Sequence, residues 1–399
     1  MKYPDIPFEQ FFAWVNRPRI MYSPGLRSEI GFEMGELGGE KVVMYTDKGL
    51  VDAGVAEMVA EEIRNAENLE LVGIFDKILQ DARIDIINDG ARFYRDKGAD
   101  SMVVVGGGSV MDTAKAVNIM IGDGQDDFQP LADQAALHEG AKLLPPHIAF
   151  PTTAGTACEV TNGMVVLDTK AKAKLSVTHP YCNADIAMLD PELTVKLPPK
   201  ITAFTGMDAL THAIESVTST AAEPIADALC LHAIRLIFTY LPIAVKEPGN
   251  ITARGNMLLA SNMAGMGFIN TMTGAVHATA HALGALYGIP HGLANSIMLP
   301  VVMEFNIEEV PERFMVIADA MGIEISGKKP LEAARMAVQA VRDLKKEIGL
   351  TESLKDFKVP AEEEKLMPLV ELAAADGQIS YNPRYVEEEN IIDFYRKAQ

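Results

Sequence analysis

Three of the chain's eight histidines lie in one apolar segment that runs from His277 to His291. His277 and His281 are four residues apart, so on a helix they lie one turn apart on the same face. Gly288 and Pro290 are expected to end that helix and to turn the chain so that His291 returns towards it. One histidine on an apolar helix face is usually a hydrogen-bonded core residue. Three in one segment favour a metal site, which still needs a fourth ligand.

A second pair of candidate ligands lies in the predicted helix 202–218, where Asp208 and His212 are also four residues apart. On its own, this pair could equally form a structural Asp–His hydrogen bond. Together with His277 and His291 it offers one carboxylate and three imidazoles. That donor set suits Fe(II) or Zn(II), with one coordination position left for a substrate oxygen. The sequence therefore predicts a catalytic metal site.

A glycine-rich turn is the second feature that could do chemistry. The turn 106–109, Gly-Gly-Gly-Ser, follows the predicted strand 101–105 and precedes the predicted helix 110–120. Glycines let the backbone approach a phosphate, and the helix N-terminus offers free N–H groups and a positive dipole end. The turn is not the G-x-G-x-x-G fingerprint, and a tight turn without a ligand would need glycine as well. Asp112 is expected in the first turn of the helix, where it would favour the dipole or cap N–H groups.

Two more features are placed to contact a nucleotide. Asp47 follows the predicted strand 42–45, where its carboxylate could accept hydrogen bonds from a ribose 2′-hydroxyl and repel a 2′-phosphate. A helix N-cap explains Asp47 equally well on local grounds. The hydroxyl-rich turn 151–161 suits hydrogen bonds to a cofactor through Oγ and backbone atoms, although an ordinary Ser/Thr turn has the same composition.

The elements that position these residues divide the chain into two parts. Short β-branched runs alternate with helical patterns in the first part, which predicts a parallel sheet wrapped by helices. The expected strands are 42–45, 71–75, 101–105, 147–150, 164–168, 175–178 and 186–189. From Leu193 onwards, long helical patterns replace them, near 202–218, 222–241, 251–269, 271–286 and 309–321. We therefore predict an α/β dinucleotide-binding domain over 1–192 and an all-helical metal-binding domain over 193–399. Residues 5–20 are either an arm that packs on a neighbour or an edge of the first domain.

Composition narrows the class of protein. The formal net charge of −20 would repel a phosphate backbone, and no Lys/Arg cluster overcomes it locally, so nucleic acid is not an expected partner. The N-terminus has no basic region followed by an apolar run, and no stretch approaches ~18 uninterrupted apolar residues. The cysteines, Cys158, Cys182 and Cys230, are far apart and odd in number, which argues against a disulfide scaffold. These features predict a soluble cytoplasmic protein without a membrane partner.

Taken as a set, the motifs resemble the iron-containing (group III) alcohol dehydrogenases. The motifs that carry the resemblance are Gly106-Gly107-Gly108-Ser109-Val110-Met111-Asp112-Thr113-Ala114-Lys115, Pro151-Thr152-Thr153-Ala154-Gly155-Thr156, Gly206-Met207-Asp208-Ala209-Leu210-Thr211-His212-Ala213-Ile214-Glu215, His277-Ala278-Thr279-Ala280-His281 and Pro290-His291-Gly292. They follow the family's order along the chain, from about Asp47 to Asn382-Pro383-Arg384. The resemblance implies a dehydroquinate synthase-like architecture, in which a nucleotide-binding α/β domain and an all-α domain enclose a cleft.

The same resemblance implies roles for single residues. It makes Asp208, His212, His277 and His291 the metal ligands, and it places His281 beside the metal as a proton-relay or cofactor-facing residue. It assigns the cofactor to Asp47, Gly106, Gly107, Gly108, Ser109, Asp112, Thr152, Thr153, Thr156, Val165 and Lys174. Asp47 matches an acidic position that favours NAD over NADP, and Phe268 matches an apolar wall near the substrate. Cys158 replaces a serine of many relatives and Gly163 an asparagine of some, which leaves the shape of the pocket open.

The implied activity is reversible, NAD-dependent oxidation of a small primary alcohol or diol to the aldehyde by hydride transfer. The metal, Fe2+ or Zn2+, would act as the Lewis acid, and His281 would pass the proton on towards water. A homodimer or larger homo-oligomer is also implied. Alternatives within the same superfold are a polyol (glycerol-type) dehydrogenase and a dehydroquinate synthase-like enzyme. An alternative from another class is a non-catalytic oligomer that keeps the fold as a scaffold or nucleotide sensor.

Overall fold

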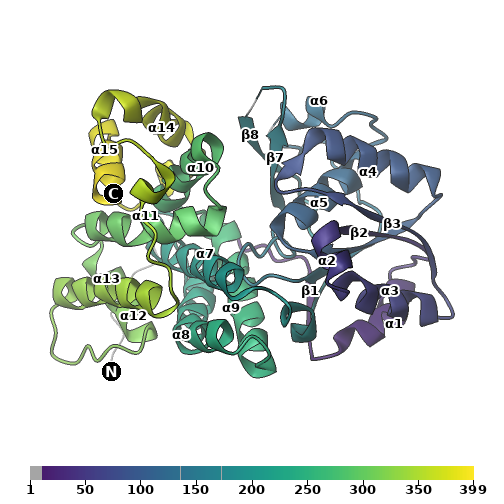
Figure 1. Ribbon diagram of the computed structural model, residues 1–399, viewed down its shortest axis with the longest axis horizontal. Helices are drawn as coiled ribbons and strands as arrows, with labels where there is room; N and C mark the ends of the chain where they lie inside the picture. The colour runs from purple at the N-terminus through teal and green to yellow at the C-terminus, as the bar shows by residue number, and fades with distance from the viewer. Residues whose placement is uncertain (1–10, 135, 172) are drawn as a thin grey trace. The chain divides into compact units, whose positions relative to one another are not determined.

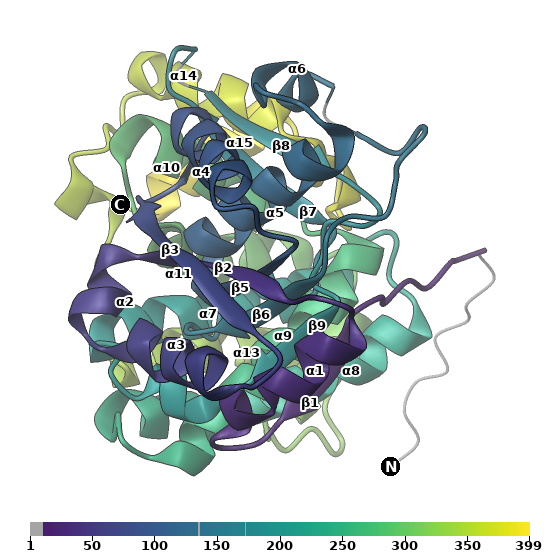
Figure 2. The same cartoon turned by 90° about the vertical axis from the view of Figure 1, so that its right-hand side faces the viewer.

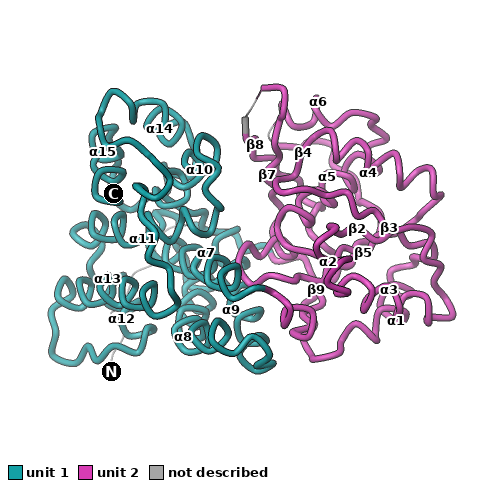
Figure 3. The backbone as a smooth tube through the Cα atoms, viewed as in Figure 1, with its two compact units in different colours: residues 1–15, 198–399 teal, residues 16–197 magenta. Residues whose placement is uncertain are grey.

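The computed structural model describes residues 11–134, 136–171 and 173–399. The chain forms two compact units (Figure 3). Unit 2 spans residues 16–197. Unit 1 spans residues 198–399 together with the described residues 11–15. The transition after residue 197 lies close to the boundary that the sequence places before Leu193.

Unit 2 is an α/β unit (Figure 1). Its strands are β1 (Arg19–Tyr22), β2 (Lys41–Asp47), β3 (Glu70–Ile78), β4 (Ala82–Arg83), β5 (Ser101–Gly106), β6 (His147–Pro151), β7 (Gly163–Asp168), β8 (Ala173–Thr178) and β9 (Ile186–Leu189). Its helices are α1 (Ile30–Glu36), α2 (Lys48–Asp52), α3 (Val55–Asn65), α4 (Ile84–Asp96), α5 (Gly108–Asp123) and α6 (Gln129–Ala132), with 3-10 turns η1 (Leu26–Glu29) and η2 (Pro191–Thr194). Six of the strands form one parallel sheet in the order β1-β9-β6-β5-β2-β3. The predicted parallel sheet is therefore present, and β1 forms one of its edges.

The central strands of this sheet are buried on both faces, which explains their continuous apolar runs. In β2, Val42 and Met44 point into a core shared with α1 and α3, whereas Val43 and Tyr45 point into a second core shared with α4 and α5. All four side chains are buried. Figure 2 shows the sheet with α1 and α3 on one side and α4 and α5 on the other.

Two expected strands do not join the large sheet. β7 and β8, predicted at 164–168 and 175–178, pair antiparallel with each other and form a small separate sheet with β4. The turn between β7 and β8 follows Asp168, whose Oδ1 accepts hydrogen bonds from the N–H groups of Lys170 and Ala171. So short a connection can only join antiparallel strands, because a parallel pair needs a crossover of a dozen or more residues.

The described part of unit 1 is helical. Its helices are α7 (Pro199–Thr218), α8 (Pro224–Lys246), α9 (Ile251–Thr271), α10 (Ala275–Tyr287), α11 (His291–Asn306), α12 (Pro311–Ala320), α13 (Pro330–Glu347), α14 (Glu363–Ala375) and α15 (Glu388–Lys397), with 3-10 turns η3 (Leu354–Phe357) and η4 (Gly377–Tyr381). The turn after α10 is as predicted, because Gly288 ends the helix at a positive φ of 64°. His291 does not lie in a loop, however. It is the first residue of α11, a helix that the sequence analysis missed.

One described helix, α8, is long and apolar enough to cross a membrane by length and composition alone. It packs against α7 and α9 within unit 1. About two fifths of its most apolar window is buried there (39%), and a core helix of a soluble protein passes the same test.

Buried His147 predicts an acid-sensitive core in unit 2. Both ring nitrogens lack a hydrogen-bond partner among the described residues, and burial together with the nearby Lys115 lowers the pKa of His147 to about 3. The unfolded chain binds this proton near pH 6.5 and the folded chain does not, so the free energy of unfolding falls as the pH drops from 6.5 towards 3. The slope from this group is at most about 1.4 kcal/mol per pH unit.

Urea unfolding between pH 7 and pH 4 tests this prediction. A His147→Leu variant cannot bind the proton, so its free energy of unfolding should fall less steeply with acid than that of the wild type. Equal slopes in the two proteins would show that His147 does not control acid stability.

Candidate active site

The first two candidate ligands lie on α7. Asp208 and His212 occur one helical turn apart, and both side chains are buried. The C-terminal two thirds of this helix, from Gly206 to Thr218, is buried on every side, because α8, α9 and α11 all pack against it. The helix therefore holds both polar side chains in a fixed position in the interior of unit 1.

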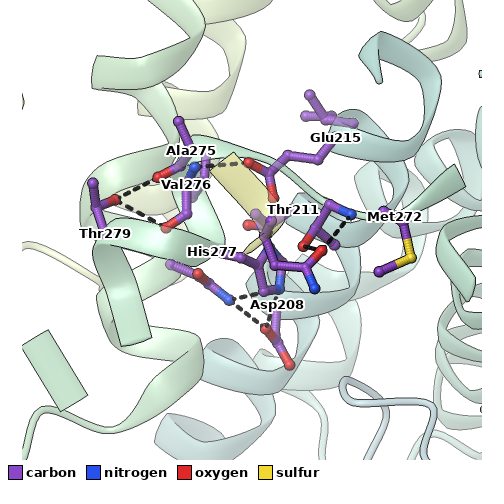
Figure 4. Close-up of polar contacts among 12 residues, drawn as sticks. Asp208, Thr211, Glu215, Met272, Ala275, Val276, His277 and Thr279 are labelled. Carbon is purple, nitrogen blue, oxygen red and sulfur yellow. Dashed lines mark hydrogen bonds and ion pairs between the residues drawn. The ribbon is translucent and has the colours of Figure 1, made fainter. Parts of the chain in front are cut away.

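The other two candidate ligands come from α10 and α11 and meet the first pair. His277 Nε2 lies 3.9 Å from Asp208 Oδ1 (Figure 4). His291 Nε2 lies 3.4 Å from the same oxygen. The ring of His212 stacks on that of His277, with centroids 4.5 Å apart. One potential ligand atom from each of the four residues lies within 4.8 Å of all the others. The structure thus brings together the four residues that the sequence predicts as metal ligands.

The chemistry of this donor set fits a divalent transition metal. Burial, and then the neighbouring imidazoles of His212 and His291, lower the pKa of His277 well below its usual value, so its ring stays neutral. A neutral imidazole keeps a lone pair for a metal, and three imidazoles with one carboxylate suit Fe(II) or Zn(II). Without a cation, nothing else among these four side chains would balance the buried carboxylate of Asp208.

Glu215 is a further site residue that the sequence analysis did not assign. Its Oε2 lies 2.5 Å from His277 Nδ1, and its Oε1 accepts the backbone N–H of Val276 at 2.7 Å (Figure 4). Burial raises the pKa of Glu215 to about 8. Contact with the carboxylate orients the His277 ring so that Nε2 is left for a metal, as carboxylate–histidine–metal arrangements do. A signal was present, because Asp208, His212 and Glu215 follow the i, i+4, i+7 spacing of one helix face.

Asn295 also contacts the candidate ligands. It lies one turn after His291 on α11, and its Nδ2 donates to Asp208 Oδ1 at 2.6 Å. The same Nδ2 lies 3.2 Å from Nε2 of both His277 and His291. The amide therefore fixes the carboxylate against the two rings. Because the sequence analysis did not predict α11, it had no reason to place Asn295 here.

His281 and Phe268 flank the four residues. The His281 ring stacks on His291 with centroids 5.2 Å apart, and its Nδ1 lies 2.7 Å from Asp376 Oδ2. Phe268, on α9, stacks on His212 at 4.2 Å with an angle of 15° between the rings. His281 therefore lies beside the ligand group, and Phe268 contributes an apolar surface next to it.

In unit 2 the glycine-rich turn 106–109 contacts the hydroxyl-rich turn 151–161. The two turns could bind one cofactor only if they lie next to each other. The N–H of Thr152 donates to the carbonyl of Gly106 at 3.0 Å. A Cβ on Gly107 would lie 3.1 Å from the side chain of Thr153, and one on Gly108 would lie 2.9 Å from that of Thr156. A side chain at either glycine would therefore force a threonine side chain to shift, and α5 begins at Gly108.

Asp47 ends the strand next to this turn. β2 and β5 are parallel neighbours, with Tyr45 opposite Val104, yet the chain continues from β2 to β3 on one side and from β5 to β6 on the other. Open α/β sheets bind ligands at such a reversal of strand order, beyond the carboxyl ends of the strands. Asp47 is also the N-cap of α2, since its Oδ1 accepts the N–H of Leu50 at 2.9 Å.

The position expected for Asp112 is wrong. α5 begins at Gly108, so Asp112 lies in the second turn and caps no N–H group of that helix. It is buried, its Oδ2 accepts the backbone N–H of Val165 at 3.0 Å, and its Oδ1 lies 3.8 Å from Lys115 Nζ. Asp112 therefore anchors β7 to α5, and the expected start of the helix at 110 was two residues late.

Asp81 links two residues predicted to contact the cofactor. Its backbone N–H donates to Ser109 Oγ at 3.0 Å, and its carboxylate pairs with Lys174 Nζ at 2.9 Å. Asp81 has a positive φ of 64°, unusual for a residue other than glycine.

Cys158 and Gly163 are the two positions that differ from many or some relatives. Cys158 is buried, and burial raises the pKa of its thiol well above the usual value. A Cβ at Gly163 would make only ordinary van der Waals contacts, with Thr178 Cγ2 at 3.7 Å and the carbonyl oxygen of Val177 at 3.9 Å.

The chain matches two family models that together cover most of its length. Residues 17–191 match the model described as iron-containing alcohol dehydrogenase, and residues 202–399 match the C-terminal model of the Fe-containing alcohol dehydrogenase family. The 1,3-propanediol dehydrogenase of Klebsiella pneumoniae is 38% identical over 379 residues, covering 94% of this chain and 96% of that protein.

Solved structures agree with this match. A crystal structure of a 1,3-propanediol oxidoreductase superposes with a TM-score of 0.92 at 37% identity, covering 98% of this chain and all of the other. The sulfoacetaldehyde reductase of Bifidobacterium kashiwanohense, solved in complex with NAD+, superposes with a TM-score of 0.85 at 31% identity and covers 98% of this chain and 99% of its own.

Proposed function

This chain belongs to the iron-containing alcohol dehydrogenase family, and we propose that it uses NAD and Fe2+ to interconvert a small primary alcohol or diol and its aldehyde. Its relatives are dehydrogenases and reductases of alcohols and aldehydes, so the chain is an oxidoreductase that acts on CH–OH groups. One observation carries the proposal furthest. A carboxylate and three imidazoles converge within 4.8 Å, in contact with the apolar ring of Phe268.

Asp208, His212, His277 and His291 would hold the metal. When bound, a divalent ion supplies Lewis-acid chemistry, which lowers the pKa of a hydroxyl group. Iron is the first choice because of the family, and Zn2+ remains an alternative because imidazole and carboxylate ligands suit both ions. Glu215 and Asn295 hold His277 and Asp208 in place. The amide of Asn295 would release Nε2 of His277 and His291 when the ion enters.

Unit 2 would bind the coenzyme, which accepts the hydride. We propose that the backbone of the turn 106–109 and the N-terminus of α5 bind the pyrophosphate, since a helix N-terminus favours an anion. Thr152, Thr153 and Thr156 would contact the ribose and nicotinamide, and Val165 and Lys174 would flank them. Asp47 would accept a ribose hydroxyl and disfavour the phosphate of NADP. The complex of a relative with NAD+ supports this choice of coenzyme.

The remaining site residues would act on the substrate. We propose that His281 takes the hydroxyl proton during oxidation and returns it during reduction, because a ring nitrogen of an imidazole can both accept and donate a proton. Phe268 would form the apolar wall beside the carbon chain of the substrate. The expected cytoplasmic location, the homo-oligomeric state and the absence of nucleic-acid or membrane partners stay predictions.

A panel of alcohols tests the proposed function. The protein is purified without oxygen, loaded with Fe2+ or Zn2+ and mixed with NAD and 1,3-propanediol, butanol or glycerol. We expect NADH to accumulate with the diol and the primary alcohol, and aldehydes to consume NADH in reverse. A strong preference for glycerol would point to the polyol branch. No change in NADH with any alcohol or aldehyde would contradict the proposal and favour a synthase-like or non-catalytic protein.

A further inference from the structure

Asp376 binds His281 from a part of the chain 95 residues away. Its Oδ2 lies 2.7 Å from His281 Nδ1, and its Oδ1 accepts the backbone N–H of Gln378 at 2.9 Å. The hydrogen bond from Gln378 caps η4, but capping does not explain the contact with His281. Both oxygens are engaged, so the carboxylate cannot turn away from the imidazole without losing a hydrogen bond.

The segment that carries Asp376 is itself fixed to the start of α10. Gln378 Oε1 accepts the N–H and the hydroxyl of Thr273 at 3.1 and 3.0 Å. Asn382 Oδ1 accepts the N–H of Ala275, and Asn382 also exchanges two side-chain hydrogen bonds with Asn306. These contacts therefore hold the carboxylate of Asp376, the N-cap of η4, at a set distance from α10, the helix that carries His281.

A carboxylate only accepts hydrogen bonds, so the imidazole nitrogen that faces it must carry the hydrogen. In neutral His281 the hydrogen then lies on Nδ1 and the lone pair on Nε2. The hydrogen bond from His281 keeps the pKa of Asp376 below its usual value, even though partial burial opposes this. His277, one turn earlier, contacts Glu215 through the same ring atom, Nδ1. Two histidines one helical turn apart thus each contact a separate acidic side chain through Nδ1.

We propose that Asp376 is a positioning residue for His281, fixing its ring and tautomer so that Nε2 is the atom that exchanges the substrate proton. The inference rests on the proposed role of His281. During oxidation Nε2 takes the hydroxyl proton and passes it to solvent, and during reduction it returns a proton to the product oxygen. Nδ1 keeps its hydrogen and Asp376 stays ionised throughout, so the carboxylate is neither consumed nor protonated.

The kinetic test is a double-mutant cycle of Asp376→Ala and His281→Ala, with Gln378→Ala as the matched control. Gln378→Ala loosens the same segment but leaves the contact with His281. We expect Asp376→Ala to lower kcat about tenfold, as the loss of an orienting partner does, with the metal content unchanged. It should cause no further loss in the His281→Ala background. Equal losses with and without His281, or an equal loss in Gln378→Ala, would overturn the proposal.

A second readout does not depend on turnover. In the zinc-loaded protein, an imidazole N–H bonded to a carboxylate gives a proton resonance far downfield, and His277 and His281 should give one each. Asp376→Ala should remove one resonance and leave the other, which Glu215 maintains. Loss of the resonance with undiminished turnover would overturn the role in proton exchange. The metal content of His277→Ala tests the proposed function separately. Among the described hydrogen bonds, Asp376 makes none to the four candidate ligands, so a failure of its proposed role would leave the metal site unaffected.

Discussion

His277→Ala should yield a folded protein that retains no metal and turns over at least ~10³-fold more slowly, since a bound ion contributes several kcal/mol to such reactions. The substitution removes a buried ring that stacks on His212 and lies 3.9 Å from Asp208. It also removes the ring nitrogen that lies 2.5 Å from the buried side chain of Glu215. A bound ion would then keep only three of its four protein ligands, so it would be held more weakly.

Metal analysis and NADH formation on the same samples measure both effects. His232→Ala is the matched control, because His232 is an exposed histidine on α8 of the same unit. It should keep the metal content and turnover of the wild type. A His277→Ala protein that is active without metal would show that the four residues are not a metal site.

Gly292→Ala should be the most damaging single-methyl change near the site. A Cβ on Gly292 would lie 2.4 Å from the backbone carbonyl oxygen of Phe204 and 3.3 Å from Asp208 Cβ. Backbone atoms cannot move aside as a flexible side chain can, so α11 would have to shift away from α7. His291 immediately precedes this contact and would move away from Asp208. We expect a loss of about 1–3 kcal/mol in stability and at least ~10-fold weaker metal binding, as misplaced ligands cause.

Thermal unfolding and competition with a chelator measure these two effects. Gly249→Ala is the control, because a Cβ there meets no atom within 4 Å. It should behave as the wild type does. If Gly292→Ala has the thermal stability and metal affinity of the wild type, the close contact of α11 with α7 does not hold the site together.

The sequence predicted the parts of the site that lie within one element or one turn. Asp208 and His212 share a helix face, as do His277 and His281, and helical spacing alone places each pair together. The turn 106–109 was equally accessible, because strand, glycines and helix follow one another directly. Fold class was predicted for the same reason, since the change from short β-branched runs to long helical patterns is a local property of composition.

Residues that reach the site through tertiary contacts were harder to find. α11 is buried almost all round, so its sequence has no polar face to mark it as a helix. Asn295 was therefore missed, and His291 was expected in a turn. Asp376 lies far along the chain from His281, and no spacing rule connects them. The sequence also gave no way to tell that Asp112 anchors a neighbouring strand, because this depends on where α5 begins.

The most direct test of the account is a metal titration of the wild-type protein. The protein is stripped with a chelator, and Fe2+ is added back without oxygen while bound metal and NADH formation from 1,3-propanediol are followed together. We predict that activity rises in proportion to bound metal and levels off at a single ion per chain. Full activity in the stripped protein, with no metal bound, would contradict the account.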